Sequence, residues 1–411
     1  MSESNPVPGS DGSSPPMSRF PLAPLILTMA MQTLATMAAF SAPTLAPDIA
    51  RDLGVDGHLI GYFVATLYGL SVFSALFSPD FIQKFGAVRV GQFILVCAIL
   101  MLVIGGLGSV LAMAICAVVI ACGYGAAAPA STHLLMPRTD PKTLNLVFSI
   151  RQIGVPLGGV LAALILPWVS QYVGWRGAFW LQIVPLLVVL VILQFYRKDW
   201  DQGRKPAHQL FKTEFWRPFL LLRDDKLMRR LSLSSFFYAG IQLCFIGFLV
   251  LQLTERAALD LVTAGQVLAV YQILGVATRP VWGWIADRFI SSIRLIGMMG
   301  LLIAVSALAA GQISESWPLS ALFAVAAVAG ATASGFSGLI YAAFAEHGGA
   351  YRTEATALGA SVMALGVLLM PTVFGFIIGE TGEYWQAYGL CAVIVAAAGL
   401  WLMSASPKRD S

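Results

Sequence analysis

Two arginines stand inside long apolar stretches of the sequence, where a positive charge is costly. Arg151 precedes "QIGVPLGG", and Arg279 lies within "GVATRPVWGW". A guanidinium group offers a planar set of N–H donors that matches a carboxylate. Three roles are therefore open for Arg151: it binds an anionic group of a substrate, it pairs with an acid such as Asp287 or Glu354, or it extends toward the membrane surface.

Uncharged polar side chains lie near the middle of other apolar stretches. Gln32 is ten residues into the stretch 22–48, and Gln242 is eleven residues into 231–252. Two amides at matching depth suit hydrogen bonding to a bound solute, although they could equally join neighbouring helices, at around 0.6 kcal/mol each. Other polar residues could join the same site: Tyr68, Tyr124, Tyr271, Gln272, Thr332 and Ser334.

The composition indicates which elements carry these residues. The chain is 58% hydrophobic and only 11% charged, whereas soluble domains carry about 25% charged residues. Several apolar stretches of about 20 residues are each long enough to cross a bilayer core of about 30 Å. A helix satisfies its own backbone hydrogen bonds in lipid, so the sequence predicts an all-α membrane protein.

Twelve spans are predicted, and an even number places both termini on one side of the membrane. Twenty of the 25 Lys and Arg residues would fall on the side of the termini and three on the other, which predicts cytoplasmic termini in a bacterial inner membrane. The spans are 22–48, 59–78, 90–108, 111–135, 144–169, 177–195, 231–252, 264–285, 294–312, 318–345, 355–379 and 387–404.

One long polar segment, 196–230, divides the spans six and six. Residues 213–230 within it suit an amphipathic helix that lies on the membrane surface near anionic lipid. We therefore expect a disordered tail (1–20), a six-helix bundle (21–195), a cytoplasmic central loop (196–230), a second six-helix bundle (231–404) and a short cytoplasmic tail (405–411).

The two halves repeat one another. A shift of 204 residues places Gly61 on Gly265, Val72 on Val276, Lys84 on Arg288 and Phe85 on Phe289 without a gap. Two parallel repeats of six spans, related by an axis along the membrane normal, are typical of membrane transporters.

The stretch "GWIADRF" (283–289) resembles the cytoplasmic signature of the major facilitator superfamily, through Gly283, Asp287 and Arg288. The first-half copy, "PDFIQKFGAVR", matches at Lys84 and Gly86, but Gln83 replaces its acid. The resemblance implies the fold of that family: two pseudo-symmetric six-helix bundles with twelve transmembrane helices.

The same resemblance implies a cytoplasmic latch. Asp287 would face the start of the span 144–169 across the two halves, where a helix N-terminus favours a carboxylate. Arg279 and Arg288 would belong to this gating region with a structural role, as would Gly283, Lys84 and Gly86. In the first half, Asp80 could take the place of the missing acid.

The sequence "GVPLGG" predicts a pivot. Gly154 and Gly158 have the spacing that lets helix backbones touch, and Gly159 follows directly. Pro156 removes one helix hydrogen bond and permits a bend. The stretch resembles a glycine–proline motif of antiporters in the same family, but its spacing differs, which leaves antiport open.

We expect a secondary active transporter for a small organic anion, with efflux of hydrophobic or drug-like compounds as the alternative. A sensor that signals through a partner is a third possibility. The sequence has no Walker-type loop, metal-ligand spacing or nucleophile–base pattern, so we expect no enzyme activity, cofactor, metal or nucleic-acid partner. The expected partners are a small-molecule substrate, membrane lipid and, left open, a coupling proton or ion. His133 or Glu346 could relay protons, and we expect a monomer.

Overall fold

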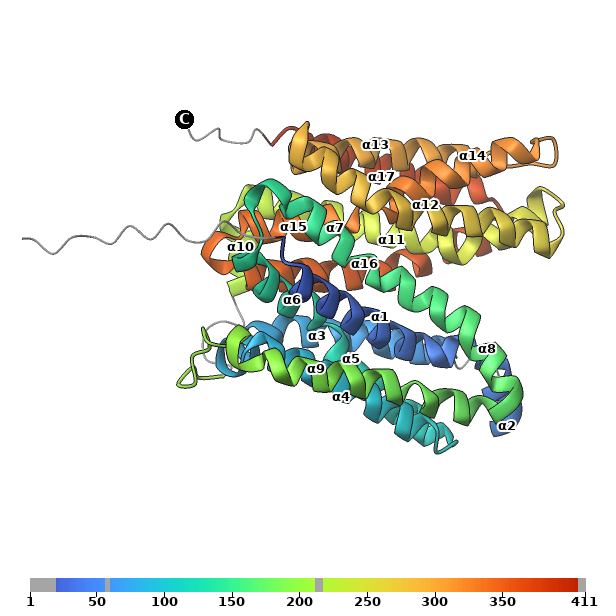
Figure 1. Cartoon of the computed structure of the whole chain (residues 1–411). Helices are drawn as coiled ribbons and strands as arrows, with labels where there is room; N and C mark the ends of the chain where they lie inside the picture. Colours follow the sequence, from blue (N-terminus) through green and yellow to red (C-terminus); the bar gives the residue numbers. More distant parts are fainter. Residues whose placement is uncertain (1–19, 56–59, 211–216, 406–411) are drawn as a thin grey trace, which may run out of the picture.

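The computed structural model describes residues 20–55, 60–210 and 217–405. Nearly all of the predicted N-terminal and C-terminal tails lie outside these residues. Within them, the regular structure is entirely helical (Figure 1). Helix α1 begins and α17 ends at the same end of the molecule, which we call the terminal end.

The first half contains nine helices and two short turns among the described residues. Gly174, with φ of 71°, interrupts the longest helix of this half, between two predicted spans. The helices are α1 (Leu22–Thr44), α2 (Ala46–Leu53), α3 (Ile60–Phe85), α4 (Ala87–Gly105), α5 (Val110–Tyr124), α6 (Ala127–Leu135), α7 (Leu144–Arg151), α8 (Gly154–Leu181) and α9 (Ile183–Trp200), with 3₁₀ turns at Met136–Arg138 and Pro141–Thr143.

The second half follows the central connection. Its elements are α10 (Arg217–Asp224), α11 (Lys226–Arg256), α12 (Leu261–Arg288), α13 (Ser292–Gly311), α14 (Leu319–Ala329), the π-helical turn η5 (Gly330–Ser334), α15 (Ser337–His347), a 3₁₀ turn (Gly349–Tyr351), α16 (Arg352–Thr381) and α17 (Tyr384–Met403).

The amphipathic helix expected over 213–230 is wrong as a single element. Helix α10 ends at Asp224, and Asp225 takes an extended conformation. Its carboxylate accepts hydrogen bonds from the backbone N–H groups of Leu227 (2.7 Å) and Met228 (3.2 Å). Asp225 therefore caps α11, because a side-chain acceptor satisfies donors that a helix start leaves unpaired. Residues 213–216 lie outside the description.

Ten stretches of the described chain are long and apolar enough to cross a membrane. One of them, Pro141–Trp200, contains two predicted spans, which meet at Gly174. Helix α12 is not among the ten, although its 28 residues are long enough to cross. Dividing the long stretch and adding α12 gives the twelve crossings predicted from the sequence.

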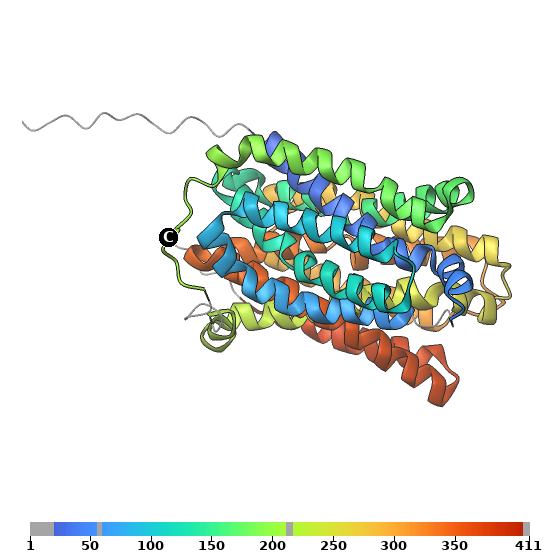
Figure 2. The ribbon, with the colours of Figure 1, turned by 90° about the horizontal axis from the view of Figure 1, so that it is seen from below.

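The buried apolar side chains form two large clusters, one in each half. One cluster draws its residues from between Leu27 and Leu193, and the other from between Met228 and Leu402. In Figure 1 the second-half helices α11 to α14 and α17 lie above the first-half helices α1 to α5 and α9. The view from below shows the first half in front of the second (Figure 2).

A third, smaller apolar cluster joins the halves at the terminal end. It contains Leu144, Val147 and Phe148 of α7 together with Ala342 and Ala345 of α15. Farther along, the Ser361 hydroxyl of α16 donates a hydrogen bond to the Val72 carbonyl of α3 (3.1 Å). The two halves are therefore closed against each other at the terminal end.

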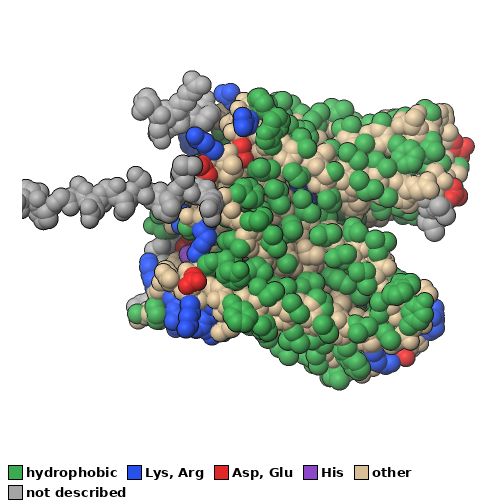
Figure 3. Space-filling view, viewed as in Figure 1, with side chains coloured by type: hydrophobic (Ala, Val, Ile, Leu, Met, Phe, Trp, Pro, Cys, Tyr) green, Lys and Arg blue, Asp and Glu red, His purple; other side chains and the backbone are tan. Residues whose placement is uncertain are grey.

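The molecular surface is apolar along its sides and charged at its ends. Figure 3 shows Lys and Arg gathered at the terminal end, with fewer at the opposite end. Large apolar side chains such as Leu111 (69% exposed) and Val393 (68% exposed) lie on the outer faces of the helices. An apolar surface of this extent requires a lipid environment. Figure 3 also shows the surface hollowed between the halves at the opposite end.

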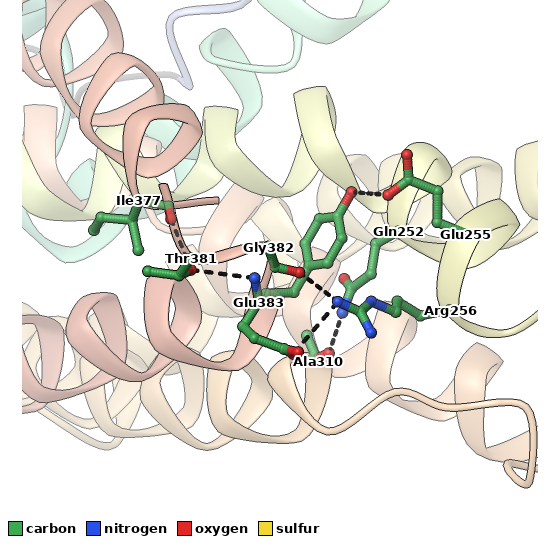
Figure 4. A network of polar contacts seen from close by, with 9 residues as sticks. Gln252, Glu255, Arg256, Ala310, Ile377, Thr381, Gly382 and Glu383 are labelled. Atoms are coloured by element: carbon green, nitrogen blue, oxygen red, sulfur yellow. Dashed lines mark hydrogen bonds and ion pairs between the residues drawn. The ribbon is translucent and has the colours of Figure 1, made fainter. Parts of the chain in front are cut away.

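Each half is fastened within itself at this opposite end. In the second half, the Tyr384 hydroxyl donates to Glu255 (2.8 Å), and Arg256 lies 3.4 Å from Glu383 (Figure 4). In the first half, Arg176 on α8 lies 2.7 Å from Asp52 on α2. None of these ion pairs joins one half to the other, so the pairs preserve each half without holding the two halves together.

Replacing Gly125 by alanine should destabilise the first half. A Cβ atom there would lie 2.0 Å from the Ser71 carbonyl oxygen and 2.8 Å from the Ala75 nitrogen of α3. Such overpacking costs about 1–3 kcal/mol, so we expect the melting temperature of the detergent-solubilised protein to fall by several degrees. The matched control is Gly389→Ala, where no atom lies within 4 Å. Equal melting temperatures would contradict this close helix packing.

Candidate functional site

Arg151 is buried at the last residue of α7. Its side chain is 2% exposed. One terminal nitrogen donates to the Gln32 side-chain oxygen on α1 (2.9 Å) and to the Ala127 carbonyl at the start of α6 (3.0 Å). The other donates to the Gln152 side-chain oxygen. All three acceptors are uncharged, so the sequence alternative in which Arg151 pairs with Asp287 or Glu354 is wrong for this structure.

Arg279 approaches the same place from the second half. It lies on α12 and is also 2% exposed. It donates to the Ser334 carbonyl (2.9 Å) and, across the two halves, to the Gln152 carbonyl. The two guanidinium groups therefore bond to opposite parts of one glutamine, Arg151 to its side chain and Arg279 to its backbone.

A proline explains why the Gln152 carbonyl can accept this bond. Helix α7 ends at Arg151 and α8 begins at Gly154, so Gln152 lies in the break of the span. In a continuous helix its carbonyl would accept from the residue four positions later. That residue is Pro156, which has no N–H group. The carbonyl instead receives the Val155 N–H at a long 3.4 Å and the Arg279 guanidinium.

The second acceptor of Arg279 belongs to a π-helical turn. This turn, Gly330–Ser334, continues α14 and consists of small residues. Its wider hydrogen-bonding pattern leaves carbonyls available to neighbours. The Ala331 carbonyl accepts from Trp282 (2.6 Å) and Thr278 (3.2 Å), both on α12. Nothing in the apolar pattern of the sequence distinguishes this turn from an α-helix, so sequence reasoning missed it.

A chain of polar contacts extends the site into both halves. On the first-half side, the Gln32 amide donates to Thr36 (3.1 Å), which lies 3.2 Å from the Tyr124 hydroxyl. On the second-half side, the Gln242 amide donates to the Ser334 hydroxyl (3.3 Å). The Gln242 backbone carbonyl accepts a hydrogen bond from the Tyr271 hydroxyl (3.3 Å).

The structure therefore joins Ser334 and five other residues predicted for the site in one network, whereas Thr332 bonds to its own helix and Tyr68 packs edge-on against Tyr124. The five others are Gln32, Tyr124, Arg151, Gln242 and Tyr271. Gln272 is half-buried on α12 and makes no hydrogen bond to the described residues, so it stands apart from the network. Sequence reasoning missed Thr36 and the bridging role of Gln152. The proximity of Gln152 to Arg151 and Pro156 was the available signal.

The electrostatics of the site are strongly positive. Because both arginines bond to one glutamine, their guanidinium groups lie roughly 10 Å or less apart. At an effective dielectric constant of about 20, two such charges repel by about 2 kcal/mol. The Nε atoms of both side chains are buried without a hydrogen-bond partner in the described part of the chain. Such a site can bind an anionic group with strong, charge-assisted hydrogen bonds.

At the terminal end of the molecule, Asp287 joins the two halves. One carboxylate oxygen accepts from the backbone N–H of Asn145 (3.0 Å) and from its side chain (2.9 Å), and the other accepts from the Leu146 N–H (2.9 Å). These donors form the first turn of α7, where the helix dipole favours a negative charge. A Cβ atom at Gly283 would lie 2.7 Å from the Leu146 Cα atom, so glycine permits this close approach.

The first-half copy of the signature makes a corresponding contact, but there the signature residue donates a hydrogen bond instead of accepting one. Gln83 at the end of α3 donates to the Glu354 carboxylate (3.2 Å), which lies in the first turn of α16. The acid thus sits on the receiving helix, whereas in the second half it sits on α12. Asp80, considered as a substitute for the acid, is bonded to His208 (3.0 Å) in the central connection.

The remaining signature residues lie around these contacts. Lys84 lies over the Phe85 ring, and Arg288 is exposed at the end of α12. Gly86 has φ of 97° and packs on Asp201, which accepts from the Val88 N–H (2.9 Å) at the start of α4. Burial raises the pKa of the Asp201 carboxyl.

The residues of the predicted pivot divide into two groups. Cβ atoms at Gly154 and Gly158 would lie 2.8 Å and 2.3 Å from the carbonyl oxygens of Met29 and Thr33 on α1, so both glycines sit at a close helix contact. A Cβ atom at Gly159 would meet nothing within 4 Å. Its place in the predicted pivot therefore has no packing basis in the structure.

Two cavities of about 320 and 330 Å³ lie away from the arginines. The first, between α2, α3 and α5, is lined mostly by apolar residues such as Ile49, Phe63 and Met113. The second lies at the terminal end beside Arg138 and Asp201. Neither contains a residue of the polar network.

An apolar exterior, two helical halves and one buried polar site shared between them define a membrane transporter. The family model described as the Major Facilitator Superfamily matches residues 28–321 and 231–411. The chain belongs to this superfamily, whose members move solutes across membranes.

Relatives with assigned names give further detail about similarity. The chain is 25% identical over 397 residues to the 4-hydroxybenzoate transporter PcaK of Acinetobacter baylyi, covering 86% of this chain and 83% of that one. It is 26% identical over 190 residues to the cis,cis-muconate transport protein of the same species, covering 45% of each. The Escherichia coli fucose:proton symporter FucP has the same fold, with a TM-score of 0.71 at 14% identity over 95% of this chain and 100% of that one.

Replacing Asp287 by asparagine should open the terminal end. Hydrogen bonds to a charged group contribute about 1.5–3 kcal/mol, so weakening them should raise the population open at this end roughly 10- to 100-fold. The reporter is a cysteine in place of Ser149, which is fully buried between the halves, in a background with the exposed Cys122 replaced by serine. We expect its alkylation by N-ethylmaleimide to accelerate accordingly.

The matched control for this experiment is Asp224→Asn. Asp224 is an exposed acid on α10 that pairs with its neighbour Arg223. Its replacement should leave the alkylation rate unchanged. If Asp287→Asn gives the same rate as this control, the Asp287 contact does not hold the two halves together.

Proposed function

We propose that the protein is a secondary active transporter for a small organic anion that carries a carboxylate. The observation that supports this most directly is Arg151, a guanidinium buried in the shared polar network. Within the described part of the chain it is bonded only to uncharged acceptors. A buried charge without a counter-charge is costly. A carboxylate from the substrate would supply the missing charge.

The other polar residues would orient the anion. In this proposal Arg151 binds the carboxylate, and Gln32 and Tyr124 contribute hydrogen bonds from the first half. Gln242 and Tyr271 contribute from the second half. The relatives named for 4-hydroxybenzoate and cis,cis-muconate act on carboxylates, which agrees with this substrate class.

Transport would proceed by alternating access between two six-helix bundles, 21–195 and 231–404. In the state described, the Asp287 and Gln83 contacts close the terminal end, and the opposite end is hollowed. We propose that the terminal end faces the cytoplasm, because basic residues gather there. Breaking the contacts would let the bundles rock about the site, driven by a proton or ion gradient. Gly154, Pro156 and Gly158 would serve as a pivot.

Two cations in the site argue against the alternative of an efflux pump for hydrophobic compounds. An apolar or cationic solute beside Arg151 and Arg279 would leave both charges without compensation and would lose favourable hydration. An anionic solute removes that cost.

Replacing Arg151 by glutamine should abolish transport of a carboxylate. Counterflow of labelled 4-hydroxybenzoate in proteoliposomes measures this without assuming import or export. Removing one partner of a buried charged pair costs about 2–5 kcal/mol, so we expect exchange to fall at least roughly 30-fold.

The control for this experiment is Arg51→Gln, because Arg51 forms a surface pair with Asp48 and its side chain is 80% exposed. This variant should exchange normally. The Arg151→Gln protein should elute as a single species. If it then exchanges normally, the anion does not bind at Arg151.

A further inference from the structure

The two buried arginines have more donors than the protein uses. A guanidinium carries five N–H donors, and contacts within the described chain occupy three on Arg151 and two on Arg279. Both Nε atoms are buried and have no hydrogen-bond partner among the residues that the structure describes. Every acceptor is uncharged: two side-chain amide oxygens and three backbone carbonyls. Both guanidinium groups thus retain unused donors, and no carboxylate among the described residues bonds to either of them.

Resting on the proposed function, we infer that the substrate is a dianion whose two carboxylates bind Arg151 and Arg279 together. Arg151 belongs to the first half and Arg279 to the second, and both bond to Gln152. The residue expected to be purely structural is thereby assigned to the substrate site. The chemical class is a small dicarboxylate that is able to span the two guanidinium groups.

The charges favour two carboxylates over one. A monocarboxylate on Arg151 leaves the charge of Arg279 uncompensated. The nearest acid on the same helix is Asp287, eight residues away along α12, and its oxygens are occupied by the first turn of α7. A second carboxylate on the same molecule neutralises the site. It also costs less ordering than binding two separate anions, because the second contact is intramolecular.

Gln152 would be the neutral occupant that the dianion replaces. Its side-chain oxygen holds Arg151 and its backbone oxygen holds Arg279, so it bridges the same two groups in the state described. When a carboxylate takes Arg279, the bond between that arginine and the first half is lost. Substrate binding would then weaken one of the contacts that keep the terminal end closed. This links occupancy of the site to movement of the halves.

Matched pairs of ligands test the inference on the unmodified protein. The probes are terephthalate against monomethyl terephthalate, and adipate against monomethyl adipate; within each pair the shape is similar and one charge is lost. Binding is measured by calorimetry on the full chain in detergent. We expect each dianion to bind about 10- to 100-fold more tightly than its half-ester, the effect of one charged hydrogen-bonded contact. Equal affinities within both pairs would overturn the two-carboxylate site.

Variants of the second arginine separate this inference from the proposed function. The affinity of Arg279→Gln for the dianion should fall to its affinity for the half-ester. Its affinity for the half-ester should change less than about 3-fold. Arg279→Lys, which keeps the charge, should retain much of the preference for the dianion. A purely structural Arg279 would instead weaken both ligands equally, and that result contradicts the inference.

The Arg151→Gln variant should bind neither the dianion nor the half-ester of each pair. If it does, and Arg279→Gln binds both like the unmodified protein, the anion site stands and only the second carboxylate site is wrong. If Arg151→Gln keeps both ligands, the proposed function itself fails. Arg51→Gln serves as the surface control and should bind all four probes normally. Absence of binding of all four probes to the unmodified protein would contradict both proposals.

Discussion

The bond from Arg279 to the Gln152 carbonyl is the contact on which the arrangement of the site depends. It exists because Pro156 cannot donate to that carbonyl, so the break between α7 and α8 leaves an acceptor facing the other half. Arg151 is the last residue before the break, which fixes its guanidinium beside Gln152. One missing N–H group thus places two positive charges from different halves around a single residue.

The contacts between the halves follow one design with different chemistry. Asp287 accepts from the first turn of α7, and Gln83 donates to Glu354 in the first turn of α16. In both cases the end of one helix meets the start of another across the interface, with one carboxylate per contact. The second-half contact uses three donors on one carboxylate, each a charge-assisted hydrogen bond. The two repeats therefore share the geometry of the contact but differ in which of the two helices carries the carboxylate.

The groups that hydrogen-bond to Arg151 and Arg279 are uncharged, and this has a physical consequence for ligand binding. An acid beside Arg151 or Arg279 would neutralise the site and compete with any anion. Amide and carbonyl oxygens instead orient the guanidinium groups while leaving their charge uncompensated. The same weak compensation that costs stability in the empty protein would favour an anionic ligand, so the site trades some folding energy for binding.

The sequence by itself determined the membrane class, the all-helical fold and the family, and it singled out the two arginines in apolar stretches. These follow from local properties: apolar length, a 204-residue repeat and arginines in apolar stretches. Tertiary structure alone decided that Arg151 pairs with no acid, that Gln272 stands apart from the network, and that Gln152 bridges the halves. It also revealed the π-helical turn at Ser334. These features depend on which side chains meet across helices far apart in the chain, and helical periodicity carries no information about those meetings.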